Sequence, residues 1–218
     1  MTAGTVSILL QGAAFTAQLA AVAIVLGTLI GIGLAVLSFS RLFVLRSAYN
    51  AYVWMIRGTP LLVQAMLLFY TAGSYFRGMG PYTAGAIILS IYLGALYVEV
   101  IRGGVLAIPN SLWDASKSLG MPKWRTTTKI VVPLVLRYTL PAYVNTCVMA
   151  VKATSILSII GVWELTFASR QIIERTLDTF SVLSMAALMY FIICFTLDRL
   201  SRRLEVRLAK RGFVGERS

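Results

Sequence analysis

The stretch GAAFTAQLAAVAIVLGTLIGIGLAVLSF, residues 12–39, contains no charged side chain and decides the fold class of the chain. As a helix rising about 1.5 Å per residue, it is long enough to cross about 30 Å of hydrocarbon. A cleaved signal peptide has a cationic segment before its apolar stretch, and this stretch has none. We therefore expect a retained membrane span. Gly27 and Gly31 form a small-xxx-small pattern within it, which predicts the close approach of another helix.

The composition of the whole chain is that of a membrane protein. Of its 218 residues, 58% are hydrophobic and 13% are charged, whereas a soluble domain usually contains about 25% charged residues. A chain this apolar is not expected to be disordered. It has no histidine, and its two cysteines, Cys147 and Cys194, are far apart in apolar surroundings. The sequence therefore predicts neither a disulfide framework nor a metal site.

Four further apolar runs bring the expected number of transmembrane helices to five. The predicted spans are about residues 12–39, 58–76, 78–101, 139–162 and 179–197. Residues 102–138 contain several charges and prolines, so we expect a polar loop there, and a second polar loop at 163–178. The chain is thus predicted to be an all-α integral membrane protein with a single transmembrane domain over residues 1–218.

Cationic residues are distributed unequally between the two sides of this predicted topology. Sixteen of the 20 Lys and Arg residues fall in segments 40–57, 102–138 and 198–218, which lie on one side. The other side has only Arg77, Arg170 and Arg175. By the positive-inside rule the first group faces the cytoplasm, which puts the N terminus outside and the C terminus inside. This topology accounts for the net charge of +12, so we do not expect nucleic-acid binding.

The segment SLWDASKSLG, residues 111–120, is predicted to form a short helix in the long polar loop. Ser111 and Asp114 have the spacing of an N-terminal capping box, and Gly120 stands where a helix favours a left-handed residue. Leu112, Ala115 and Leu119 would share one face, and Asp114, Lys117 and Ser118 the other. On these residues alone, the helix either lies on lipid headgroups or contacts a partner protein.

The spacing of this loop resembles the EAA loop of ABC importer permeases. That pattern is Glu-Ala-Ala, three residues, Gly, nine residues, Ile, any residue, Leu, Pro. The chain keeps every spacing and departs from the pattern at Asp114, Ser116 and Val132. In the family the loop forms a coupling helix that docks on the ATP-hydrolysing subunit. The resemblance implies this role for Asp114, Ala115, Ser116, Gly120, Ile130 and Pro133.

Three other segments resemble the polar amino acid uptake permeases in particular. They are IRGTPLLVQ at 56–64, EVIRGGVLAIP at 99–109 and KATSILSIIGVWEL at 152–165. Arg57 could instead be an interfacial cation whose side chain snorkels to the membrane surface, and Glu99 could pair with Arg102 one turn away. The family-motif residues are Arg57, Gly58, Thr59, Pro60, Gln64, Glu99, Arg102 and Gly103.

Lys152 is a candidate substrate ligand, because it lies about 20 Å along the fourth span from residue 139. A cation at that depth is costly unless it is paired or hydrated, and it could hold the carboxylate of an amino acid. Thr154 and Ser155 could add hydroxyl donors, and Glu164, expected at the solvated outer end of the span, could face an amino group. Ala153 stands where many relatives have a polar or acidic residue, which favours a neutral or acidic substrate. The alternative for Lys152 is an ion pair with an acid of a partner chain.

The resemblance implies the type I ABC importer permease fold and a non-enzymatic, pore-forming subunit for polar amino acids in the bacterial inner membrane. Its expected partners are membrane lipid, a second identical or related permease, two ATP-binding subunits and an extracytoplasmic amino-acid-binding protein. We find no glycine-rich phosphate loop, so ATP and Mg²⁺ are expected on the ATP-binding subunits and no cofactor on this chain. The alternatives are a secondary transporter or channel independent of ATP, and an intramembrane enzyme. The first usually has internal repeats and the second needs paired acids or metal ligands, neither of which we find.

Overall fold

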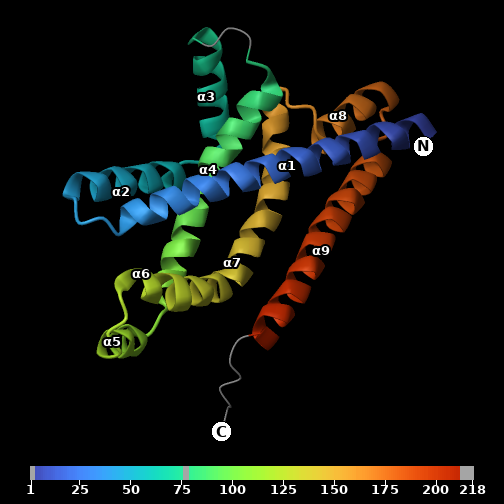
Figure 1. The fold of residues 1–218 in the computed structure, drawn as a ribbon. Coiled ribbons are helices and arrows are strands. Elements are labelled where there is room, and N and C mark those ends of the chain that lie inside the picture. Colours follow the sequence, from blue (N-terminus) through green and yellow to red (C-terminus); the bar gives the residue numbers. More distant parts are fainter. Residues whose placement is uncertain (1–2, 76–78, 212–218) are drawn as a thin grey trace.

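The computed structural model describes residues 3–75 and 79–211, and this part of the chain is helical and contains no β-strand (Figure 1). The all-α prediction is therefore confirmed. In chain order the elements are α1 (Ala3–Ser38), α2 (Phe43–Gly58), α3 (Leu61–Tyr75), α4 (Pro81–Leu106), α5 (Asn110–Ser118), α6 (Lys123–Thr126), the π-helix η1 (Thr127–Val131), α7 (Val132–Ala153), the 3-10 helix η2 (Thr154–Ile160), α8 (Leu165–Thr176) and α9 (Thr179–Arg211).

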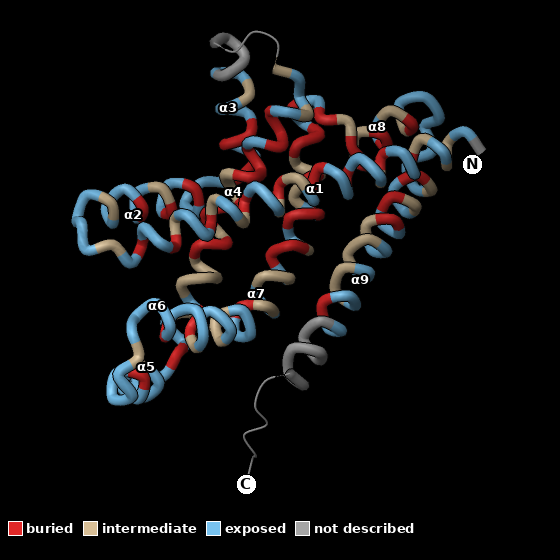
Figure 2. Tube along the Cα trace, in the orientation of Figure 1, coloured by how far each residue is buried: buried red, intermediate tan, exposed pale blue. Residues whose placement is uncertain are grey.

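The core of the protein lies where α1 crosses α4. A Cβ atom added to Gly27 would lie 2.7 Å from Leu93 Cβ, and one added to Gly31 would lie 2.7 Å from Tyr97 Cβ. Both Leu93 and Tyr97 are fully buried. The predicted close approach at the two glycines is thus confirmed, since any side chain there would push the helices apart. Figure 2 shows the buried residues concentrated along α4 and its neighbours.

Four helical segments are long and apolar enough to cross a membrane. They are Gly4–Ser38, Pro81–Leu106, Lys123–Ile160 and Thr179–Arg203. A fifth is present if α2 and α3 count as one broken span, because they meet at a bend of 107°. The spans predicted within 12–39, 78–101, 139–162 and 179–197 each have a counterpart among the four. Arg77 and the predicted junction of the second and third spans lie outside the described residues.

The predicted second span, 58–76, corresponds in the structure to α3 and the corner that precedes it. Its helix α3 has 15 residues, which gives a length of about 23 Å. The bend has a local cause, because Pro60 has no backbone N–H and disfavours the helical conformation of the residue before it. Thr59 is accordingly extended, with φ −120° and ψ 143°.

Both predicted polar loops contain helices. Helix α4 continues to Leu106, and the helical segment of the fourth span begins at Lys123 rather than at residue 139. The prediction that residues 102–138 are interrupted by prolines is only partly correct, since Pro133 lies in the first turn of α7, where proline is tolerated. The second loop contains α8, which buries Leu165, Ala168 and Ile172 on one face.

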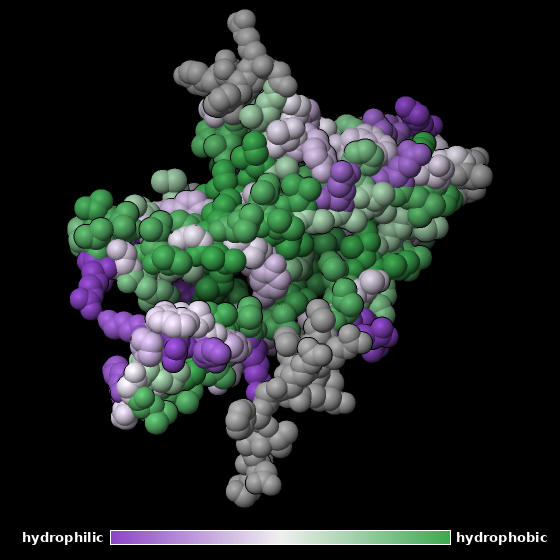
Figure 3. All heavy atoms as spheres, in the orientation of Figure 1, coloured by the Kyte–Doolittle hydropathy of each residue, from purple (hydrophilic) through white to green (hydrophobic). Residues whose placement is uncertain are grey.

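The outside of the bundle is largely apolar, as Figure 3 shows on the face it presents. Large hydrophobic side chains are exposed along α1, α3 and α9, including Leu29, Leu67 and Phe191. Such a surface is unfavourable in water and suited to lipid. Hydrophilic residues gather mainly at the ends of the bundle, near α5 and α8.

Candidate functional site

Helix α5 projects from one end of the bundle, at the lower left of Figure 1, between the ends of α4 and α6. Helix α4 ends at Leu106, and the chain reaches α5 through a short connection that ends at Pro109. The side chain of Ile108 in this connection is buried. The buried side chain anchors this short connection between the two helices, while α5 itself stands away from the core.

The capping box predicted at the start of α5 is wrong. The helix begins earlier, with Pro109 in the N-cap position at φ −60° and ψ 137°, and no side chain caps it. Ser111 is thus already inside the helix. The proline ring holds the residue in the conformation that a helix start needs, which explains the shift.

The predicted end of α5 is confirmed. Gly120 has a left-handed φ of 64°. Its backbone N–H donates to the Lys117 carbonyl at 2.9 Å, and the Met121 N–H donates to the Ser116 carbonyl at 3.0 Å. These two bonds form a Schellman motif, which favours glycine because a Cβ atom is strained at that φ.

The surface of α5 combines apolar and charged side chains. Ser116 is buried and donates its hydroxyl to the Trp113 carbonyl at 2.9 Å. Ala115 is exposed, as are Leu112 and Leu119, the last with 78% of its surface accessible. Asp114 Oδ1 lies 3.2 Å from Lys117 Nζ. This mixed surface, with a shallow hollow lined by Asn110, Trp113, Asp114 and Lys117, is suited to a protein contact.

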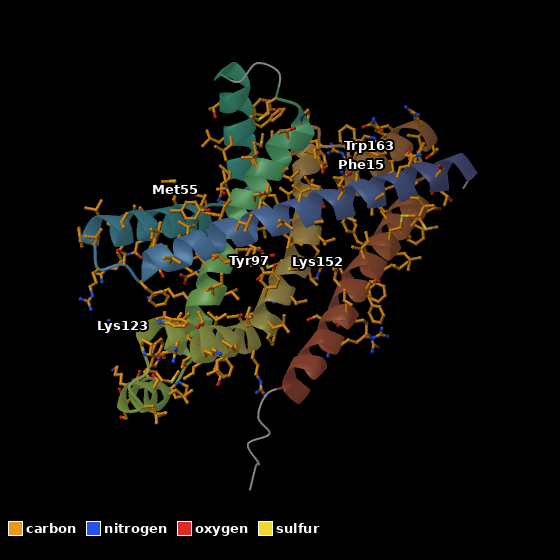
Figure 4. The ribbon with its side chains drawn as sticks, in the orientation of Figure 1. Phe15, Met55, Tyr97, Lys123, Lys152 and Trp163 are labelled. Carbon is orange, nitrogen blue, oxygen red and sulfur yellow. The ribbon has the colours of Figure 1, made fainter. Side chains whose placement is uncertain are left out.

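The remaining residues of the EAA pattern lie where the chain returns to the bundle. Ile130 is half-buried in η1, and Pro133 is exposed in the first turn of α7. Between them and α5 lies an exposed cationic stretch that includes Lys123, labelled in Figure 4, and Arg125, whose guanidinium lies 5.2 Å from the centre of the Trp124 ring. The loop thus presents two adjoining exposed surfaces at the same end of the molecule.

Two of the family motifs meet at the carboxyl group of Glu99 in α4. Arg57 Nη1 lies 3.2 Å from Glu99 Oε2, and the Tyr49 hydroxyl donates to Glu99 Oε1 at 2.5 Å. The predicted pairing with Arg102 is present but longer, at 4.0 Å. Arg57 is therefore an ion-pair partner as well as an exposed cation. Tyr49 was missed, although its place about two turns before Arg57 on α2 puts both on one face.

Gln64 joins α3 to the end of α2. Its side-chain amide donates to the Ile56 carbonyl at 2.7 Å, and it also lies within hydrogen-bond distance of the Thr59 carbonyl and hydroxyl. A Cβ atom at Gly58 or Gly103 would meet none of the described residues, so packing in this part of the chain does not require either glycine. The RGTP segment is thus the corner between two helices, closed by a buried amide.

Lys152 lies near the end of α7, on the side toward α9, as Figure 4 shows. Its exposed side chain lines a hollow of 330 Å³ between α7 and α9. Among the side chains that the structure describes, no carboxylate lies within ion-pair distance of it. The hollow is lined by Pro141, Val144, Asn145, Val148, Lys152, Phe191, Cys194, Phe195, Asp198 and Ser201.

The hydroxyl donors predicted beside Lys152 are directed elsewhere. Thr154 is fully buried and donates to the Val151 carbonyl at 2.8 Å. The Ser155 hydroxyl donates to the carbonyl of Lys152 itself at 2.7 Å. The tight turns of η2 aim both hydroxyls back along the chain, so neither joins the ammonium group in the hollow.

The solvated position predicted for Glu164 is also wrong. Glu164 is fully buried as the N-cap of α8. Its carboxyl oxygens accept from the Phe167 N–H at 2.8 Å, the Tyr190 hydroxyl at 2.6 Å and the Thr16 hydroxyl at 3.3 Å. The residue ties α1, α8 and α9 together and does not face an approaching amino group.

Comparisons with known proteins agree with one another over nearly the whole chain. Residues 11–210 match the family described as binding-protein-dependent transport system inner membrane component. The L-cystine transport system permease protein TcyB of Bacillus subtilis is 33% identical over 202 residues, covering 92% of this chain and 86% of that protein. The glutamine transport system permease protein GlnP of Escherichia coli is 31% identical over 208 residues, covering 93% and 94%.

The solved structures that resemble this chain share its arrangement of helices. A chain in the crystal structure of an amino acid ABC transporter with histidines aligns with a TM-score of 0.88 at 29% identity, covering 93% of this chain and 94% of that chain. A chain of the inward-facing MetNI methionine ABC transporter aligns with a TM-score of 0.80 at 17% identity, covering 95% and 99%. At that lower identity, the second match concerns the fold alone.

Proposed function

Because the chain belongs to the binding-protein-dependent transport system inner membrane component family, we propose that it is the permease subunit of an ATP-driven ABC importer for polar amino acids. It is a multi-pass protein of the bacterial inner membrane. The observation that carries this conclusion is the similarity to amino acid permease subunits over more than nine-tenths of the chain, 92% and 93% for the two relatives. The close crossing of α1 and α4 and the projecting helix α5 are the structural features that support the proposal.

Helix α5 is the surface through which the chain contacts its ATP-binding partner. This helix follows the end of α4 and exposes Leu112, Ala115 and Leu119 beside the Asp114–Lys117 pair. An ATP-binding subunit can bind to such a mixed surface. ATP and Mg²⁺ bind to that subunit, and two copies of it serve a pair of permease chains, identical or related. In this arrangement the N terminus faces the outside and α5 faces the cytoplasm.

The hollow between α7 and α9 is where the amino acid contacts this chain. An extracytoplasmic binding protein delivers the amino acid, and the pore opens first outward and then inward. The ammonium of Lys152, which forms no ion pair with the described side chains, attracts the substrate carboxylate, while Phe191 and Phe195 supply an apolar wall. A cation within a membrane span is costly unless it is hydrated or paired, so an anionic group is favoured beside it.

Uptake by the reconstituted complex tests the proposal. The chain would be purified with its ATP-binding subunits, placed in proteoliposomes with its binding protein, and supplied with radiolabelled polar amino acids. We expect uptake with ATP and Mg²⁺, and none with a non-hydrolysable ATP analogue. Uptake that follows an ion gradient and ignores ATP would instead identify a secondary transporter.

A further inference from the structure

Glu99 connects two helices that lead to different parts of the molecule. Helix α4 carries Glu99 about two turns before its end, and from there the chain runs directly into α5. Helix α2 carries Tyr49 and Arg57, both of which contact the Glu99 carboxyl group. The residues after α2 turn through 107° into α3. One carboxyl group therefore links the base of α5 to the corner between α2 and α3.

The contacts hold α2 lengthwise against α4. Tyr49 and Arg57 are about 12 Å apart along the axis of α2, yet their side chains converge on the same carboxyl group. Between them, the Tyr52 hydroxyl donates to the Ile91 carbonyl of α4 at 2.5 Å. Helix α2 cannot slide along α4 without breaking at least one of these bonds.

The corner between α2 and α3 is also held together by hydrogen bonds. The buried side-chain amide of Gln64 binds the Ile56 and Thr59 carbonyls, so the first turn of α3 is attached to the last turn of α2. A displacement of Arg57 is therefore passed to α3. The Gln64 amide thus bridges the extended Thr59-Pro60 segment between the two helices.

Stability alone does not account for the ion pair. The side chains are partly solvated, with 49% of Arg57, 33% of Glu99 and 42% of Arg102 accessible. Exposed ion pairs of this kind stabilise a fold little. Helix α2 is already held on α4 by the apolar cluster of Ala35, Tyr49, Val53 and Val98. What the pair adds is a directional contact between charged groups at the end of α2.

We propose that Glu99 is a positioning residue that passes movement of α5, through α4 and Arg57, to the α2–α3 corner. This rests on the proposed function, since the ATP-binding subunit supplies the movement of α5. When α5 is displaced, the end of α4 moves with it, and Glu99 carries Arg57 and the corner along. The ion pair thus links ATP hydrolysis to the rearrangement of the membrane helices.

The number of amino acid molecules imported per ATP hydrolysed, measured in proteoliposomes with the full complex, tests this proposal. Glu99→Gln and Arg57→Gln should each lower this ratio by about threefold, since each removes a partly solvated contact between charged groups. Hydrolysis should continue, and the complex should remain assembled. Arg57→Lys keeps the charge and should restore most of the ratio. Arg46→Gln is the matched control, because it removes an exposed cation from the same helix that pairs with no carboxylate among the described side chains, and it should behave like the unchanged protein.

Three results would overturn the proposal. The ratio could stay unchanged in Glu99→Gln and Arg57→Gln, it could fall as far in Arg46→Gln, or the two variants could lose their ATP-binding subunits on purification, which would indicate a role in assembly only. Failure of the proposed function itself gives a different result, because the unchanged protein would then show no ATP-dependent uptake to compare.

Discussion

Glu99 and Glu164 are both glutamates that join helices, yet they do so in opposite ways. Glu164 is fully buried and bonded to a backbone N–H and two hydroxyl groups, from elements α8, α9 and α1. Glu99 has 33% of its side chain accessible and is bonded to an arginine and a tyrosine of α2. The first lies at the end of the bundle that carries α8, and the second lies on the side of α5.

The difference between the two glutamates indicates which helix contacts are harder to disturb. A buried acceptor with several donors is expensive to disturb, because each donor left without a partner pays its desolvation cost. A partly solvated ion pair is cheaper to distort, since water can replace part of the contact while the charged groups stay together. We therefore infer that the junction of α1, α8 and α9 is rigid and that the contact between α2 and α4 is adaptable.

The largest loss of stability is expected from Glu164→Ala. Removing the carboxyl group leaves the Phe167 N–H and the Thr16 and Tyr190 hydroxyls without this acceptor, which should lower the free energy of unfolding by about 3 kcal/mol. Thermal unfolding of the detergent-solubilised protein measures the effect. Glu174→Ala, an exposed position on the same helix, is the control. Equal shifts in the unfolding temperature of the two variants would show that the hydrogen bonds of Glu164 add no stability beyond that of an exposed glutamate.

A smaller and more local loss is expected from Gly120→Val. A β-branched residue resists the φ of 64° at Gly120, and we expect a cost of about 2 kcal/mol confined to the end of α5. The protein should still insert into the membrane, but it should fail to assemble with the ATP-binding subunit or should separate hydrolysis from uptake. Gly33→Val, where a side chain would meet open space, provides the comparison. Normal ATP-driven uptake by Gly120→Val would remove α5 from the coupling role.

A still smaller change in stability is expected from Glu99→Gln. The substitution keeps the shape of the side chain and removes a partly solvated charge, so the free energy of unfolding should fall by less than about 1 kcal/mol. The unfolding midpoint should be compared directly with that of Glu164→Ala. If the two midpoints fall equally, the distinction between a rigid junction at Glu164 and an adaptable contact at Glu99 is wrong.

The smallest effect on stability is expected from Lys152→Met, since Lys152 makes no ion pair with the described side chains. Its effect should appear in transport, where the substrate concentration for half-maximal uptake should rise by about tenfold if the lysine binds the carboxylate. Lys152→Arg keeps the charge and should retain most of the uptake. Unchanged transport by Lys152→Met would eliminate the substrate role, and loss of the paired permease chains would favour an ion pair between them.

Features decided by nearby residues were predictable from the sequence. The left-handed end of α5 follows from Gly120 after a short polar helix, and the close approach of another helix to α1 follows from Gly27 and Gly31. The all-helical membrane fold follows from the long uncharged runs. In each case the responsible residues lie within a few turns of the feature.

Features decided by residues far apart in the chain were not predictable in this way. The ion pair of Arg57 with Glu99 joins positions 42 residues apart, and the burial of Glu164 depends on Thr16 and Tyr190 from two other helices. The corner at Pro60 signals a break, but its angle of 107° depends on the packing of α2 and α3 against the bundle. No local pattern contains that information.

The most direct test of the coupling account is to ask what α5 touches in the assembled transporter. Ala115→Cys, with Cys147 and Cys194 replaced by serine, would be labelled with a thiol-reactive photocrosslinker in membranes that contain the whole complex. Because Ala115 is exposed on α5, we predict a covalent product with the ATP-binding subunit. Arg170→Cys, exposed on α8 at the other end of the bundle, should give no such product. A product from Arg170→Cys and none from Ala115→Cys would contradict both the coupling role of α5 and the orientation of the chain.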